Sequence, residues 1–171
     1  IRDGVIDSIS QMGKIAVPTL IESLKDEDTT LVANAAKTLG LISAPESVEP
    51  LIKSLKHEDS FVRQSSIEAL GKISDKKAIE PIKVLIKDES NYVRELAAKA
   101  LEELGWVPET DEEKLDALVA KSDWNSVTDL GGEAVDRLIS LLDDEDSEQA
   151  VKCLGEIGDK RAVEPLIKII Q

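Results

Sequence analysis

The hydrophobic positions of this chain follow one pattern that returns three times at an interval of 31 residues. The segments that share the pattern are Val17–Asp28, Val48–Asp59 and Ile79–Ser90. Within each segment the apolar residues are spaced three and four apart, which is the spacing of one face of an α-helix. A fixed period of this size is typical of stacked arrays, in which each unit buries its apolar face against its neighbours. The pattern therefore predicts an array of repeated helices.

A second helix is predicted after each of these segments, with small residues in its middle that let neighbouring backbones approach closely. We interpret Gly40 and Gly71 as left-handed residues that close these helices. Ser43 is interpreted as the cap of the helix that follows it. The second helices are expected over Leu31–Gly40, Val62–Gly71 and Val93–Leu101.

The period changes between residues 106 and 131. Thr110–Glu113 has the pattern of a capping box, which predicts a helix that starts there and ends near Lys121. A shorter helix is expected from Asp123 to Leu130. We interpret the segment as a shortened repeat and not as a linker, because apolar residues continue through it. They are Leu115, Leu118, Val119, Trp124, Val127 and Leu130.

The repeats predict a single array that includes the whole chain. Residues 1–13 match only the end of the short repeat, and residues 159–171 match only a first helix, so we expect a fragment of a longer array. Full repeats are expected over 14–43, 44–74 and 75–105. A short degenerate repeat is expected over 106–131, and a repeat with a shortened second helix over 132–158.

The residues of Val48–Asp59, Val62–Arg63 and Ala69–Ile73 together resemble the HEAT-like repeat named after phycobilisome lyases, and Gly155–Ile167 resembles it equally well. The resemblance implies an all-α fold, a right-handed α-α superhelix in which antiparallel helix pairs stack into a solenoid of the armadillo type. It also implies a scaffold without catalytic activity that binds a protein partner on the concave face lined by the second helices. A few members are enzymes or lyase subunits, so a subunit of a bilin lyase or a related protein-modifying enzyme is the alternative.

The outward-facing positions of the second helices are the candidate partner-binding residues. They are expected to form rows across successive repeats, and the first row begins with Ala33. Aromatic residues occupy another equivalent position in two units, and large rigid side chains dominate interface energetics. The alternatives are an ordinary solvated face and aromatic residues that only seal the corners between helices. The candidates are Phe61, Tyr92, Gln64, Glu68, Lys72, Glu95, Lys99 and Lys37.

Composition and charge narrow the choice of partner. The formal net charge of −14 repels phosphate backbones, so nucleic acid is not expected as a ligand. For the same reason the chain is not expected to be a helical repeat of the DNA-repair type. A basic protein is the better electrostatic match. No stretch is long and apolar enough for a membrane span. Cys153 is the single cysteine, so an intramolecular disulfide is excluded and a cytoplasmic location is favoured. We expect Cys153 to be a small core residue. The oligomeric state stays open.

Candidate chemistry is sparse in this sequence. Acidic residues gather at the corners between paired helices, for example at Asp26–Asp28 and Asp143–Asp146, where they could attract a basic partner or hold a divalent ion. Helix capping and the helix dipole explain them equally well. His57–Glu58 is interpreted as a surface corner, because one histidine cannot supply a di-iron site. No catalytic set of residues, metal site or cofactor is predicted. Trp106 and Trp124 are expected to anchor the short repeat.

Overall fold

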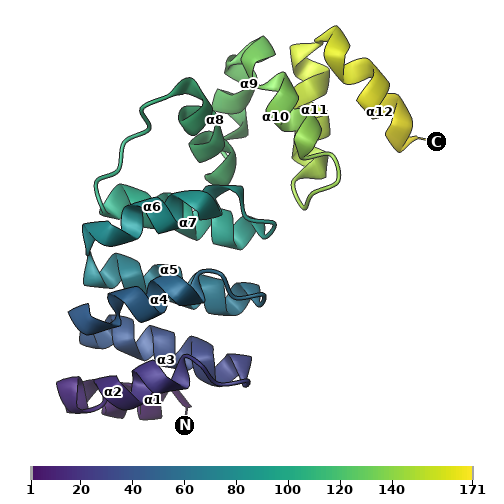
Figure 1. The fold of residues 1–171 in the computed structure, drawn as a ribbon. Coiled ribbons are helices and arrows are strands. Elements are labelled where there is room, and N and C mark those ends of the chain that lie inside the picture. The colour runs from purple at the N-terminus through teal and green to yellow at the C-terminus, as the bar shows by residue number, and fades with distance from the viewer. Residues whose placement is uncertain (1, 171) are drawn as a thin grey trace. The chain divides into compact units, whose positions relative to one another are not determined.

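A computed structural model of the chain describes residues 2–170 and consists of helices joined by short turns (Figure 1). That part of the chain contains no strand. None of the helices in it is long and apolar enough to cross a membrane. The expected all-α fold of packed helix pairs is confirmed.

The helices form two compact units. The first extends to Ile86 and includes Leu96–Val107, and the second comprises Lys87–Glu95 with the described residues from Pro108 onward. The division falls inside helix α7 (Asn91–Glu103), so this helix contributes residues to both units. The expectation of one continuous array therefore stays a prediction.

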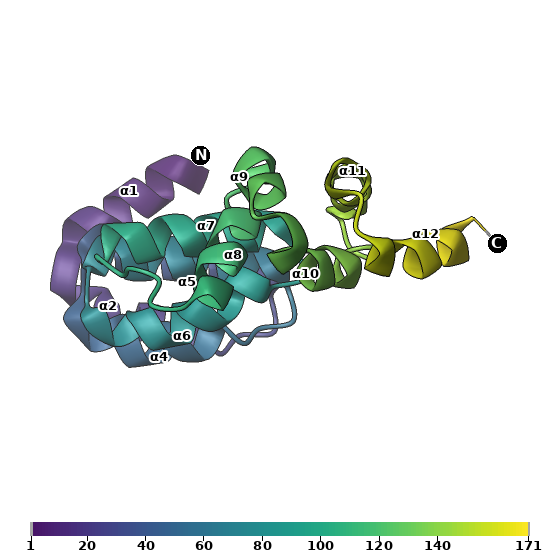
Figure 2. The same cartoon turned by 90° about the horizontal axis from the view of Figure 1, so that it is seen from above.

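The first unit consists of helix pairs in which α2 packs on α3 and α4 packs on α5. Figure 2 shows α2, α4 and α6 along one side of this unit and α5 along the other. Short 3-10 helices lead into or continue several of the α-helices. The elements are α1 (Arg2–Met12), η1 (Gly13–Ile15), α2 (Val17–Ser23), α3 (Thr29–Ile42), η2 (Pro45–Ser47), α4 (Val48–Ser54), α5 (Ser60–Ile73), η3 (Lys76–Ala78), α6 (Ile79–Lys83) and η4 (Val84–Lys87).

The starts of the second helices α3 and α5 are fixed by aspartate caps. Asp28 accepts hydrogen bonds from the backbone N–H groups of Thr30 and Leu31 at the start of α3. Asp59 accepts one from the N–H of Phe61 at the start of α5, at 2.8 Å. Each cap satisfies backbone donors that have no partner inside the helix. The acidic residue at these corners thus has a local structural role.

The ends of α3 and α5 differ from the expectation. Their left-handed closing residues are Ser43 and Ser74, with φ of 54° and 57°, whereas Gly40 and Gly71 lie inside the helices. The interpretation of Ser43 as an N-cap is wrong as well, because its hydroxyl donates to the carbonyl of Gly40. Only α11 ends on a left-handed glycine, Gly158, among these three helices. Gly40 and Gly71 must therefore be explained by packing.

Gly40 is required by the contact between α3 and α5. A Cβ atom at this position would lie 2.6 Å from the Cα of Ala69 and 2.9 Å from its Cβ, which is closer than real atoms approach. At Gly71, the equivalent position in the next repeat, a Cβ would meet only Glu103 Oε2 at 3.4 Å and Ala100 Cβ at 3.7 Å. The expected close approach of second-helix backbones is therefore present at Gly40.

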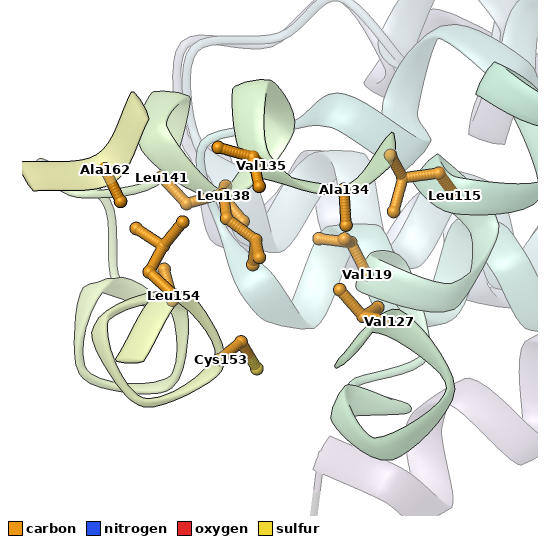
Figure 3. Close-up of a cluster of buried hydrophobic side chains, with 11 residues drawn as sticks. Leu115, Val119, Val127, Ala134, Val135, Leu138, Leu141, Cys153, Leu154 and Ala162 are labelled. Atoms are coloured by element: carbon orange, nitrogen blue, oxygen red, sulfur yellow. The ribbon is translucent and has the colours of Figure 1, made fainter. Parts of the chain in front are cut away.

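The second unit has a hydrophobic core formed by side chains from successive helices (Figure 3). Leu115 and Val119 of α8 face Val127 of α9 and Val135 and Leu138 of α10 across this core. The segment 106–131 thus folds into two helices with buried apolar residues. The elements are α8 (Asp111–Ala120), α9 (Trp124–Asp129), η5 (Gly131–Glu133), α10 (Val135–Ser140), α11 (Ser147–Ile157), η6 (Lys160–Ala162) and α12 (Val163–Ile169).

Several expectations for the second unit are confirmed. Thr110 accepts a hydrogen bond from the N–H of Glu113 and caps α8. Helix α11 has 11 residues against 14 in α3 and α5, which is about one turn less. Cys153 is buried in the core, and its thiol donates to the carbonyl of Trp124 at 3.8 Å. Trp124 packs against the same core and anchors α9 to it.

Candidate functional site

The candidate residues of α5 form a stripe along one face of the helix. Phe61, Gln64, Glu68 and Lys72 are separated by three or four residues, so they lie on the same side of the helix. Three of them are exposed and Gln64 is half-buried. The opposite side of α5 is buried, and Val62, Ser66 and Leu70 lie there. The amphipathic pattern thus fixes which side chains reach solvent.

The candidate residues of α7 have the same spacing. Tyr92, Glu95 and Lys99 follow at intervals of three and four residues and are all exposed. Glu103, which is not one of the candidates, continues the stripe four residues later and is also exposed. Lys37 is exposed on α3. Ala33 does not belong with them, because it is buried in a small cluster with Val32 and Val62 and not exposed as its row required. Ala33 is therefore removed from the candidate surface.

A groove joins the two stripes within the first unit. It has a volume of about 250 Å³ and brings Glu68 and Lys72 of α5 together with Lys99 of α7, three of the candidates. Gly71 has no side chain, so the carboxylate of Glu103 can lie close to its backbone. We call this site the α5–α7 groove. It is lined by Ile67, Glu68, Gly71, Lys72, Leu96, Lys99, Ala100 and Glu103.

The charged side chains of the α5–α7 groove have no hydrogen-bond or ion-pair partner within residues 2–170. In the described part of the chain, no ion pair or hydrogen bond involves the side chains of Glu68, Lys72, Lys99 or Glu103. Two carboxylates and two ammonium groups thus face solvent beside the half-buried apolar side chain of Leu96. Such a groove can bind a segment that offers charges of both signs and apolar contacts between them.

The two aromatic candidates are solvent-exposed. Phe61 is 54% exposed and Tyr92 is 67% exposed, and each is the second residue of its helix. This exposure contradicts the alternative that they only seal corners between helices, because a sealing side chain would be covered. Trp106 differs from them, since it is half-buried and the Nζ of Lys83 lies 5.7 Å from its ring centroid. A lysine over the face of an indole is a cation–π contact, which holds this tryptophan in place.

The acidic corner before α11 is occupied by a buried arginine. Arg94 is 1% exposed and its guanidinium donates to Asp144 and Asp146, with 3.2 Å between Nη2 and the nearer oxygen of Asp144. It also donates to the backbone carbonyls of Asp88 and Glu89. Asp146 stands at the N-cap of α11 but makes no capping hydrogen bond. This corner is therefore not a row of free carboxylates, because Asp144 and Asp146 both bind Arg94.

Arg63 is the equivalent of Arg94 in the preceding repeat, and it also donates to backbone carbonyls at the corner before its helix. Arg63 is buried, and its Nη1 donates to the carbonyls of His57 and Glu58 at 2.9 and 2.8 Å. His57 is half-buried, and its Nδ1 accepts a hydrogen bond from the N–H of Asp59. The interpretation of His57 as a corner residue is consistent with this geometry. Among residues 2–170, no group of three or more His, Cys, Asp or Glu side chains is placed to hold a metal ion.

A larger pocket in the second unit was not found by the sequence reasoning. It has a volume of about 590 Å³ and lies between α8 and α10. At its wall the buried carboxylate of Asp116 accepts from Lys87 Nζ at 2.8 Å and from Arg137 Nε at 2.9 Å. The hydrogen bond to Asp116 raises the pKa of Lys87, and Glu112 acts in the same direction. The available signal was one acidic residue inside the apolar stripe of the 110–121 helix.

Two family models match the chain. The model described as HEAT repeats matches residues 1–70, 17–102 and 48–130. The model described as PBS lyase HEAT-like repeat matches residues 148–171. No curated protein matches the chain. Among solved structures, it is similar to the crystal structure of an engineered protein from the Northeast Structural Genomics Consortium, with 24% identity and a TM-score of 0.45. That match covers 89% of this chain and 67% of the other.

Proposed function

This chain belongs to the HEAT repeat family, and we propose that it is a non-catalytic scaffold that binds a protein partner on the surface lined by its second helices. HEAT repeats mediate protein–protein interactions. The observation that carries the proposal is the α5–α7 groove, whose four charged side chains have no partner in the described fold. Folding explains the acids at the capped corners, but it does not explain these groups.

The stripe on α5 extends the groove into a binding surface. Phe61 lies on the same side of α5 as Glu68 and Lys72, so a partner seated in the groove can also cover this exposed ring. A large aromatic anchor beside a polar groove is the usual composition of an interface that binds through a few dominant residues. The net charge of −14 favours a partner with basic segments and accelerates their encounter.

The proposal is tested by affinity capture followed by measured binding of the captured protein. Phe61→Ala combined with Tyr92→Ala should weaken binding by at least about 2 kcal/mol, which is roughly thirtyfold. Lys72→Glu with Lys99→Glu should also weaken it, because two groove charges change sign. The matched control is Lys53→Glu with Lys56→Glu, which makes the same charge change at exposed positions on and just after first helix α4.

Substitutions at the acidic corners should affect the rate of partner binding more than its affinity. Glu27→Gln should mainly slow association and reduce its dependence on salt, because this exposed carboxylate acts at long range. The proposal fails if the groove variant and the aromatic variant bind the captured partner as tightly as the unmodified chain does. It also fails if the control on α4 loses binding while both of these variants retain it.

A further inference from the structure

A pocket between two first helices of the first unit is lined by lysines. It has a volume of about 350 Å³ and is formed by α2, α4 and the turns that follow them. Its lining includes Lys25, Lys53, Lys56 and His57, and within residues 2–170 no acidic side chain lines it. We call it the α2–α4 pocket. Acidic residues outnumber basic ones by 35 to 21 in this chain, so a pocket lined by lysines and no acid needs an explanation.

The lysines of the α2–α4 pocket are available to a ligand. The side chains of Lys53 and Lys56 are exposed and make no ion pair or hydrogen bond with any residue from 2 to 170. Lys25 pairs with Glu22 at 2.7 Å, but the two side chains are 69% and 74% exposed. An ion pair in such contact with water contributes little, so Lys25 can exchange Glu22 for a ligand. Three ammonium groups are therefore available to one bound molecule.

His57 stands at a position that aspartate fills in the neighbouring repeats. The equivalent residues, 31 positions away on either side, are Asp26 and Asp88. Each of the three side chains accepts a hydrogen bond from the backbone N–H two residues later, at 2.9 Å for Asp26 and 3.0 Å for His57 and Asp88. The turn thus requires an acceptor, and aspartate supplies it twice. Folding alone does not explain why the residue that lines this pocket is a histidine.

A histidine at this turn changes what the pocket offers to a ligand. It accepts the same hydrogen bond without bringing a carboxylate to the lining, and the accepting Nδ1 leaves the ring proton on Nε2. This N–H has no partner within residues 2–170, so it is a further donor. Lys53 follows the same pattern, because its equivalents in the other repeats are Glu22 and Val84. The helix dipole favours a lysine near the end of α4, but it acts equally on those repeats.

We propose that the α2–α4 pocket binds a small phosphorylated anion. Lysine ammonium groups are point charges that suit the oxygens of a phosphate, whereas flat carboxylates are matched best by arginine. Within residues 2–170, no arginine lines this pocket. Its volume lies in the range of small-molecule sites, and Ile21 and Pro50 offer apolar contacts to the carbon part of a phosphate ester.

The net charge of −14 opposes such a ligand less strongly than it opposes nucleic acid. A nucleic acid would cover a wide acidic surface, whereas a small anion contacts only the lining of the pocket. The pocket belongs to α2 and α4, which lie along one side of the first unit, whereas α5 lies along the other (Figure 2). The inference is independent of the proposed function, because anion binding is measured with phosphate compounds alone and partner binding is measured without them.

NMR titration of the whole chain with pyrophosphate, at constant pH and ionic strength, tests the proposal. The backbone amide signals of residues 53–57 should shift and reach saturation below about 10 mM. Citrate carries a comparable charge on carboxylates and should bind at least about tenfold more weakly. This comparison separates recognition of phosphate from attraction to any small anion.

Two substitutions place residues of the neighbouring repeats in the pocket. His57→Asp keeps an acceptor for the turn, and Lys53→Val removes one ammonium group, so each should retain the fold, which circular dichroism verifies. Each should weaken pyrophosphate binding at least about tenfold. Lys76→Val is the matched control, because it removes an exposed lysine of the same unit outside the pocket. An unmodified chain that does not bind pyrophosphate overturns the proposal. So does binding that both variants retain, or citrate that binds as tightly as pyrophosphate.

Discussion

Replacing Gly40 by alanine tests the close packing of the second helices. In a helix interior, alanine is more favourable than glycine by about 1 kcal/mol, so the substitution would stabilise an uncrowded helix. At Gly40, however, the new Cβ would lie 2.6 Å from a backbone atom of Ala69, and backbone cannot rotate away as the end of a flexible side chain can. The substitution therefore requires α3 and α5 to move apart.

The magnitude follows from comparison with Gly71. Overpacking of a tight contact costs about 1–3 kcal/mol, and the higher helix propensity of alanine, here called the helix term, offsets about 1 kcal/mol of that cost. Gly40→Ala should therefore lower the free energy of unfolding by up to roughly 2 kcal/mol. Gly71→Ala meets only a carboxylate oxygen at 3.4 Å and a methyl group at 3.7 Å, so it should gain most of the helix term. The helix term cancels between the two variants. Their difference in unfolding free energy, about 1–3 kcal/mol, then measures the packing term.

Urea denaturation followed by circular dichroism at the helix band provides the measurement, with the midpoint and the slope compared for the three proteins. The expected order of midpoints is Gly71→Ala highest, the unmodified chain next and Gly40→Ala lowest. Equal midpoints for the two variants would refute the packing explanation of Gly40. A change in slope would instead indicate that the variant alters the surface exposed on unfolding.

Three further predictions follow from the second unit and its boundary. Arg94→Met should lower the unfolding free energy by about 3–5 kcal/mol in urea, because two acids lose their buried cation, whereas Lys152→Met removes only an exposed pair and should have a much smaller effect. The side chain of Arg161 lowers the pKa of Asp159 to about 2, so carbon-detected NMR should show Asp159 titrating near pH 2 and, in Arg161→Gln, closer to its usual 3.8. This depressed pKa contributes stability above about pH 3.8 that is lost as pH falls through about 2. Limited proteolysis should cut the irregular residues 107–110 first and leave 111–131 intact, and rapid cleavage within 111–131 would show that this segment is a linker.

The helix pairs could be predicted from the sequence because the forces that form them are local. Apolar residues three and four apart, Asp28 at a helix start and Thr110 with Glu113 each act within a few residues, and a repeat shows each signal several times. The stripe of Phe61 and Glu68 was predictable for the same reason, since one helix sets its spacing. The assignment of Gly40 as a helix-closing residue failed because the reason for this glycine is a contact with α5, the second helix of the following repeat.

The remaining features depend on residues that are distant in the sequence. Arg94 reaches acids 50 and 52 residues away, and Asp116 meets Arg137 21 residues away. Nothing in the local pattern distinguishes Arg94 from a solvated charge, and the only local signal for Asp116 is its place inside the apolar stripe of its helix. The shortened repeat also has no earlier counterpart of its full length in this chain, so periodicity alone could not show which side chains line the pocket between α8 and α10.

On the proposed function, we expect long-range charge and partner specificity to be carried by different residues. The corner acids Asp28 and Asp59 cap helices, and Asp144 and Asp146 bind Arg94, so their removal would first destabilise the fold. They still contribute to the net charge of −14, which acts at long range and is screened by salt. The charges of the α5–α7 groove have no such partners and can be exchanged without losing a described contact. If the groove binds the partner as proposed, variation in partner choice among related arrays is expected at these positions and constancy at the corners, because within residues 2–170 the groove charges make no ion pair or hydrogen bond that a substitution would break.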